Sequence, residues 1–193
     1  MLQLNHPLFR VLVFCFLAAL MAVAFALRAH AADIPAYDGS SQTPGSNAPG
    51  AKSELPLDRP NIEITALLPW VTDTVTEAYT LAPEDYTQNL KKLAEKFTKD
   101  GWKDFTRTLA KNSVIDEISK HGMTVSIIPG NPVLIREGLK EDAYQWLVSI
   151  PVTLTYTKEK DSRNELTTIS VTVSHVPLKD NVLGIQIDSW DQT

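Results

Sequence analysis

Cysteine is nearly absent from the sequence: Cys15 is the only one among 193 residues, and it lies near the N-terminus. A domain formed by the later residues therefore has no disulfide, no cysteine nucleophile and no thiolate metal site, so packing alone must stabilise it. Histidine is also scarce, and no two of the four share the spacing of a helical metal site: His6, His30, His121 and His175. The sequence therefore predicts no metal centre.

Motifs of the common catalytic classes are missing too, because the sequence contains no Gly-rich phosphate loop, no nucleophile elbow and no redox motif. Positively charged residues are also outnumbered by acidic ones. Arg10 and Arg28 are the only charged residues before position 33, so the remainder holds 16 basic and 23 acidic residues, a net charge of −7. Such a domain repels phosphate backbones, which argues against direct nucleic-acid binding. Because the catalytic motifs are missing, we expect neither an enzyme nor a cofactor.

Residues 11–27 form a run without a charge or a helix breaker, and Arg10 precedes them. Ala29 and Ala31 follow at the small-x-small spacing of a cleavage signal. This pattern predicts a secretory signal peptide over residues 1–31, cut after Ala31. A retained anchor is the alternative, because the run reaches the lower limit for spanning a bilayer. Both interpretations place the rest of the chain outside the cytoplasm, and the second attaches it to the inner membrane.

The next segment, residues 32–60, is rich in Pro, Gly and Ser and has few large apolar residues. Such a composition cannot bury enough surface to offset the entropy of ordering the chain. We therefore expect a disordered linker over residues 32–60 that leads into one domain over residues 61–193.

The central feature of that domain is the stretch Tyr144–Thr157, in which apolar and polar residues alternate. Side chains of a strand alternate between faces, so this pattern predicts a long strand with one buried face. Shorter strands are predicted around it, over residues 123–128, 133–139, 166–176 and 183–190. A polar hairpin loop over residues 158–164 is expected to project from the sheet.

Helical patterns come before these strands. Pro69 suits the first turn of a helix that continues to Leu81, and residues 61–67 form either an edge strand or the approach to that helix. Further helices are expected over residues 84–97, 102–109 and 113–121, separated by a break at Lys99–Gly101. Helices followed by four or five antiparallel strands predict an α+β domain, with the helices packed on one side of a curved sheet.

Two groups of residues occur in an order and spacing that resemble a known family. The helical group comprises Ala78, Tyr79, Thr80, Tyr86, Leu90, Phe97, Thr98, Gly101, Trp102 and Phe105. The sheet group comprises Pro132, Val133, Leu134, Gly138, Tyr144, Trp146, Val148, Pro151, Val152, Val176, Pro177, Asp180, Asn181, Gly184 and Ile185. Together with Leu57–Asn61 they resemble the DotI/IcmL/TraM family of type IVB secretion systems and related conjugation machines.

The resemblance implies a cone-like fold of the nuclear-transport-factor-two type, shared with the VirB-eight-like assembly factors. It implies a non-enzymatic periplasmic scaffold that self-associates, as a homo- or hetero-oligomer, and binds other type IVB secretion subunits. Relatives of the DotI type carry a longer cytoplasmic segment and a retained transmembrane helix. We therefore expect a shorter, exported variant that partners an anchored relative.

Two tryptophans are candidate contact residues for such partners. Trp190 is out of phase with Ile185 and Ile187, which predicts an exposed position on the sheet. Trp70 lies at a helix start on the side opposite Val71.

The alternative function is a small-ligand-binding or isomerase-like cone domain, because such folds often hold a pocket. That chemistry needs a carboxylate or histidine in an apolar cavity near a polarising group. Tyr79, Tyr86 and Asp85 are the nearest candidates, and His175 is a weaker one as a general base. A core aromatic role for Tyr79 and a helix-start role for Asp85 are the simpler interpretations.

Overall fold

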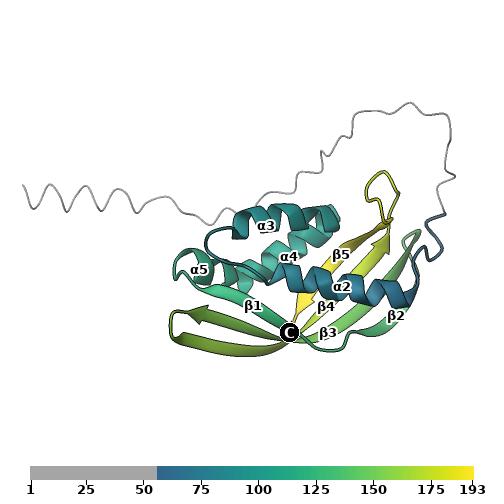
Figure 1. Cartoon of the computed structure of the whole chain (residues 1–193). Helices are drawn as coiled ribbons and strands as arrows, with labels where there is room; N and C mark the ends of the chain where they lie inside the picture. Colours follow the sequence, from purple (N-terminus) through teal and green to yellow (C-terminus); the bar gives the residue numbers. More distant parts are fainter. Residues whose placement is uncertain (1–55) are drawn as a thin grey trace, which may run out of the picture. The chain divides into compact units, whose positions relative to one another are not determined.

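The computed structural model describes residues 56–193, so the predicted leader with its cleavage position after Ala31 lies outside the described residues. Helices come first along this part of the chain and strands follow (Figure 1). The helical segments are α2 (Ile64–Ala78), α3 (Tyr86–Leu93), the 3₁₀ helix η1 (Ala94–Lys96), α4 (Lys99–Lys111) and α5 (Val114–Ser119). The strands are β1 (Thr124–Pro129), β2 (Val133–Lys140), β3 (Ala143–Lys158), β4 (Asp161–His175) and β5 (Ile185–Gln192).

Strand β3 is the centre of a fully antiparallel sheet with the order β1-β3-β4-β5. One edge of β3 pairs with β2 along its first half and with β1 along its second half. The other edge pairs with β4 from Gln145 to Lys158. The predicted strand Tyr144–Thr157 is therefore confirmed within one residue at each end, and so is the α+β fold with helices against a curved sheet.

The alternation predicted for β3 produces the core. Every second residue from Trp146 to Tyr156 is buried, whereas the residues between them are half-buried or exposed. The buried face meets helices α2 and α4, which lie across the same side of the sheet (Figure 1). One sheet and one layer of helices thus enclose a single core.

Two helix boundaries differ from the prediction. Helix α2 begins at Ile64, so Pro69 lies inside it rather than in its first turn, and residues 61–67 do not form a strand. Helix α4 begins at Lys99, because the Thr98 side chain accepts a hydrogen bond from the Gly101 N–H at 3.1 Å and caps the helix start. The expected break at Lys99–Gly101 is therefore the first turn of a helix.

The hairpin between β3 and β4 also differs from the prediction. The polar residues expected to form a loop over 158–164 instead extend both strands, and only Glu159 and Lys160 connect them. The backbone of Glu159 adopts a positive φ of 52°, as a tight turn requires. The hairpin therefore projects as paired strands, seen at the lower left of the sheet in Figure 1.

Contacts of the domain extend back to Leu57. The Tyr144 N–H donates to the Leu57 carbonyl at 2.7 Å, and the His175 Nδ1 lies 2.9 Å from the Arg59 carbonyl. Leu57 and Arg59, which the sequence places at the end of the linker, are thus bonded to the sheet. No helix among residues 56–193 is long and apolar enough to span a membrane.

Candidate functional site

The space between the helices and the C-terminal part of the sheet is filled by aromatic rings. The centroids of Phe97 and Phe105 are 5.2 Å apart in a stacked arrangement, and Phe105 meets Trp190 edge-on at 4.9 Å. Tyr79 adds an edge contact to Phe105 at 6.5 Å. All four side chains are at most 3% exposed. A ligand pocket at this place would require these rings to be absent, so the alternative of a small-molecule site gains no support here.

The Tyr79 hydroxyl, a candidate for polarising a substrate, is buried in the core and hydrogen-bonded there. It donates a hydrogen bond of 2.5 Å to Oε1 of the buried Gln192. Burial raises the pKa of Tyr79 well above its ordinary value of 10.0, because the phenolate would lose its hydration. A raised pKa in a closed, hydrogen-bonded pair indicates a structural group rather than an acid or base that meets a substrate.

The prediction that Trp190 is an exposed contact residue is wrong, because Trp190 is only 3% exposed. Strand β5 contains a β-bulge: Thr172 pairs with Ser189 but Val173 pairs with Ile187, so Asp188 is an extra residue. An extra residue shifts the alternation of side chains by one position. Trp190 therefore faces the same buried side as Ile187.

The other candidates named from the sequence occupy separate places. Trp70 is half-buried on α2 and stays a candidate contact residue. Asp85 is exposed at the N-terminal boundary of α3, and Tyr86 is half-buried in its first turn. His175 is 4% exposed and bonded to the Arg59 carbonyl, as expected of a satisfied core histidine. The structure thus does not bring Asp85 or His175 together with Tyr79 in one cavity.

Groups of three or more His, Cys, Asp or Glu side chains that could hold a metal ion do not occur among residues 56–193. A groove of about 370 Å³ lies beside the start of α2, where Glu63, Glu137 and Tyr144 are among its lining residues. Desolvation and the neighbouring Glu137 carboxylate raise the pKa of Tyr144. Two carboxylates and a neutral phenol in this groove supply no cation to hold an anionic ligand.

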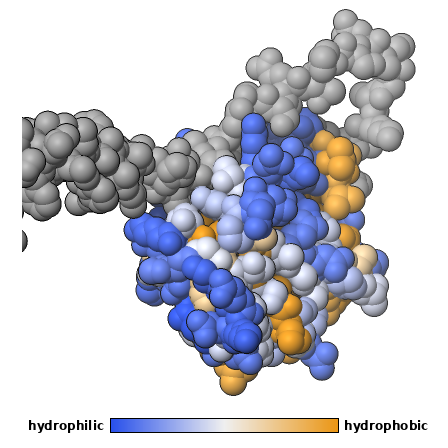
Figure 2. Space-filling model, turned by 60° about the vertical axis from the view of Figure 1, so that its left-hand side comes forward, coloured by the Kyte–Doolittle hydropathy of each residue, from blue (hydrophilic) through white to orange (hydrophobic). Residues whose placement is uncertain are grey.

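Exposed apolar side chains lie in small groups on an otherwise hydrophilic surface, and one face of that surface is shown in Figure 2. One group is spread along β2, where Val133 and Leu139 lie on opposite faces of the sheet because a bulge separates them. A second is on the loop between β4 and β5, and a third joins β1 to β4. The members of these groups are Val133, Ile135 and Leu139; Leu178, Val182 and Leu183; and Ile128 with Leu166.

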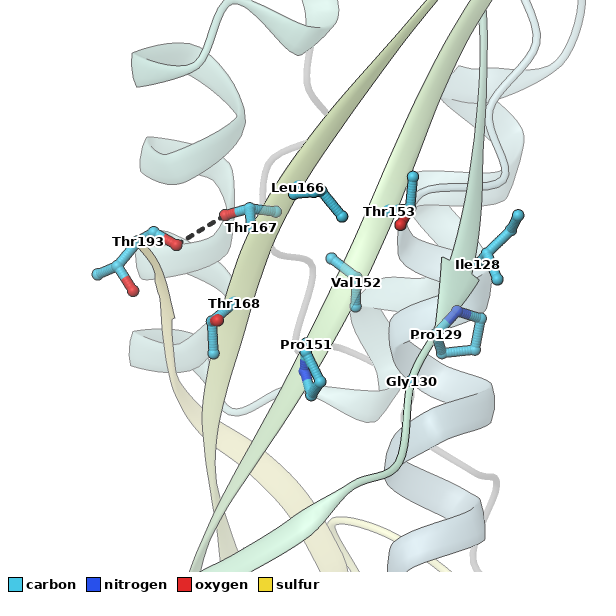
Figure 3. Close-up of a pocket in the computed structure, with 10 residues that line it drawn as sticks. All are labelled: Ile128, Pro129, Gly130, Pro151, Val152, Thr153, Leu166, Thr167, Thr168 and Thr193. Atoms are coloured by element: carbon cyan, nitrogen blue, oxygen red, sulfur yellow. Dashed lines mark hydrogen bonds between the residues drawn. The ribbon is translucent and has the colours of Figure 1, made fainter.

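The third group lies on the face of the sheet that the helices do not cover. Ile128 pairs with Thr153, and Thr153 pairs with Leu166, so the three side chains form a row across β1, β3 and β4. Ile128 is 67% exposed and Leu166 is 85% exposed. A shallow groove of about 470 Å³ runs through this row and extends past Pro151 to Thr193 (Figure 3). We call it the outer-face groove.

The outer-face groove was not found from the sequence, although part of its signal was present. Leu166 is out of phase with Ile169 and Val171, which are buried, so its large side chain had to point to the opposite face. Ile128 is likewise out of phase with the buried Val125. Apolar side chains on an open sheet face, with no acid–base pair beside them, are suited to protein contact rather than to chemistry.

The comparisons with known proteins agree with this architecture. Solved structures of secretion proteins share its fold: the periplasmic domain of DotI gives a TM-score of 0.66 at 21% identity, covering 68% of this chain and 96% of that one. A periplasmic fragment of TraM gives 0.65 at 18% identity, covering 67% and 96%. An IcmL-like type IV secretion system protein from Legionella pneumophila gives 0.60 at 19% identity, covering 68% and 93%.

Curated proteins gave no match to this chain. A family model does match: the one described as type IVB secretion system, inner-membrane complex component, aligns with residues 49–193. The match covers all the described helices and strands. The chain therefore belongs to the DotI/IcmL family of type IVB secretion system components, as its residue order predicts.

Proposed function

We propose that this chain is a non-enzymatic periplasmic scaffold of a type IVB secretion or conjugation apparatus, which acts by self-association and by binding other subunits. The observation that carries the proposal is the family match over residues 49–193. The packed aromatic core supports a role in binding, because Tyr79, Phe105 and Trp190 occupy the space that a substrate would need. Binding by such a domain uses its surface.

The outer-face groove is the surface we assign to another subunit of the apparatus. Ile128 and Leu166 rim it with exposed apolar side chains, while Thr153 and Thr168 supply hydroxyl groups on the same face of the sheet. An apolar centre with a polar surround is the usual composition of a protein interface. Trp70 on α2 is a second contact on the opposite, helical side of the domain, where an aromatic ring can anchor a partner.

The periplasm is the proposed location, because related proteins of the same fold are periplasmic domains. Export would follow from cleavage after Ala31, or attachment to the inner membrane from retention of residues 11–27. N-terminal sequencing of the exported protein separates the two, since a mature protein that starts at residue 32 is cleaved and one that starts at Met1 is retained.

A clean, in-frame deletion of the gene tests the proposed role. Substrate transfer by the apparatus should be lost and should return when the gene is supplied on a plasmid. An affinity-tagged copy, recovered after cross-linking in intact cells, should bring down other subunits of the apparatus, an anchored family relative among them. Normal transfer in the deletion strain would contradict the proposal.

A further inference from the structure

The β3–β4 hairpin has one edge that no described strand covers. Strand β4 pairs with β5 only from Ile169 to His175, and the Thr168 and Thr193 backbones exchange two further hydrogen bonds. Residues 161–167 of β4 therefore pair with β3 alone within residues 56–193. Seven residues of strand, about 23 Å at 3.3 Å per residue, present an open edge.

The direction of the open backbone groups follows from the neighbouring pairs. Thr168 bonds toward β5, and alternate residues of an antiparallel strand bond to the same side. Ser162, Asn164 and Leu166 therefore direct their N–H and C=O groups outward from the open edge. Arg163 and Glu165 bond to β3 instead, and their side chains point to the opposite face of the sheet from Asn164.

The side chains along this edge would complement those of the same edge in a second copy of the chain. When two copies of the edge pair antiparallel about a two-fold axis at Asn164, each Asn164 meets the other and each Ser162 meets a Leu166. In the same register each Arg163 lies directly opposite a Glu165, twice per pair. Opposite charges in directly facing positions stabilise neighbouring strands.

The two nearest alternative registers are unfavourable. A two-fold axis at Arg163 places the two Arg163 side chains opposite each other and Asp161 opposite Glu165, so that like charges meet. A two-fold axis at Glu165 requires Ser162 to pair with Thr168, whose edge is already bonded to Thr193. The register with the axis at Asn164 pairs the whole open segment and breaks no existing backbone hydrogen bond.

Arg163 has contacts within its own chain that leave some of its donors unused. Its guanidinium lies 4.1 Å from the centroid of the Tyr156 ring, and its Nη2 donates to Glu117 Oε1 at 2.9 Å. A guanidinium has five N–H donors, so further donors remain for a second carboxylate. Glu165 makes no ion pair within residues 56–193, and it is exposed.

From these observations we propose that a second copy of this chain adds to the sheet edge-to-edge, β4 against β4, with Asn164 at the two-fold axis and two Arg163–Glu165 pairs across the interface. The proposal deepens the self-association in the proposed function and names its surface. The symmetric contact is closed, since the same patch serves both copies. It lies along the sheet edge, so it meets the outer-face groove only at Leu166 and leaves the face of β1 and β3 open for another subunit.

Site-specific disulfide formation tests the register in the full-length chain carrying Cys15→Ser. Directly opposed residues of such a pair have Cα atoms about 5.5 Å apart, within the reach of a disulfide. Asn164→Cys should therefore give a cross-linked dimer on a non-reducing gel. Ser162→Cys alone and Leu166→Cys alone should stay monomeric, because the symmetry-related positions are about 13 Å apart along the strands. A mixture of those two variants should cross-link.

Charge exchange gives an independent test in the Asn164→Cys background. Arg163→Glu and Glu165→Arg should each raise the dimer dissociation constant about tenfold, because both facing pairs become repulsive. Mixing the two variants should restore the dimer, since every facing pair is then attractive again. Arg107→Glu on α4 also breaks an exposed ion pair, and it should leave the dimer unchanged.

These experiments use cells that lack the secretion apparatus, so their outcome is independent of the transfer test above. A monomer with Asn164→Cys would overturn the proposal. So would equal cross-linking by Ser162→Cys alone, which would indicate random collision, or a mixture of the charge variants that stays monomeric.

Discussion

At the scale of single residues, the hydrogen bond from Tyr79 to Gln192 joins the end of α2 to the last strand inside the core. Tyr79→Phe should lower the free energy of unfolding by about 1–3 kcal/mol, because the buried Gln192 oxygen loses its donor. Urea unfolding followed by tryptophan fluorescence measures the change. Tyr86→Phe is the matched control on a half-buried ring and should change stability by less than about 0.5 kcal/mol. Equal effects of the two substitutions would contradict this role.

The same residue makes stability depend on alkaline pH. Burial raises the folded-state pKa of Tyr79 well above 10.0 and that of Tyr156 to about 12, whereas both ionise near 10.0 when unfolded. The folded state therefore holds more protons above pH 10, so stability is fully present below pH 10 and falls as the pH rises toward 12. Urea midpoints at pH 9, 10 and 11 should decline, and less steeply in the double variant Tyr79→Phe, Tyr156→Phe. An identical slope in that variant would refute the assignment.

The two candidate tryptophans should now behave differently. Trp190→Ala should destabilise the domain by about 3–5 kcal/mol, because it leaves a cavity among packed rings. Trp70→Ala should cost no more than about 1 kcal/mol and instead reduce substrate transfer, because its ring is half-exposed on α2. Unfolding curves of both proteins and transfer assays of both strains separate the two effects. Normal transfer with Trp70→Ala would remove that residue from the contact surface.

At the scale of elements, helix α4 approaches β5 at Gly101. A Cβ at this position would lie 2.1 Å from the Ile187 carbonyl oxygen, so only glycine fits. Gly101→Ala should destabilise the domain by about 3 kcal/mol, even though alanine is the better helix former. In the same helix Ala110→Gly, the reverse exchange at an exposed position, should cost only about 1 kcal/mol. Thermal unfolding of both variants checks the comparison, and a stabilising effect of Gly101→Ala would contradict it.

The elements also show which parts of the fold a sequence can reveal. Strand β3 was predicted almost to the residue because its alternation from Tyr144 to Tyr156 is uninterrupted. The face of Trp190 was predicted wrongly because the bulge at Asp188 depends on partners elsewhere. Asp188 accepts hydrogen bonds from Thr98 at 2.9 Å and Gln145 at 3.3 Å, and neither contact is visible in the local pattern. Position on a strand is local information, whereas a bulge is set by tertiary contacts.

At the scale of the whole molecule, helices cover one face of the sheet, and the other face carries the proposed contact surface. Ile128→Lys should reduce substrate transfer about tenfold, because a charge would enter the apolar centre of the outer-face groove. The unfolding free energy should change by no more than about 0.5 kcal/mol at this exposed site. Ser126→Lys, on the same face of β1 but outside the groove, is the matched control and should transfer normally. Equal transfer by both strains would exclude the groove as a contact surface.

Family and fold class were predictable from the sequence because both depend on the order of many residues, so single errors do not remove them. The contact surface was less predictable. Ile128 and Leu166 are 38 positions apart in the sequence, and they meet only because both pair with Thr153 of β3. Such a patch forms only when the strands pair in the right register, and no single segment of the sequence specifies that register.

The position of β3 in chain order has a consequence for biosynthesis. Both β1 and β2 precede β3 in the chain, yet β3 is their only strand partner among residues 56–193. A ribosome adds about 5–20 residues each second, so β1 and β2 are synthesised before the strand with which they pair, and β3 is complete only at Lys158. The nascent chain thus holds no stable sheet through most of translation, and the domain closes only when its final third arrives.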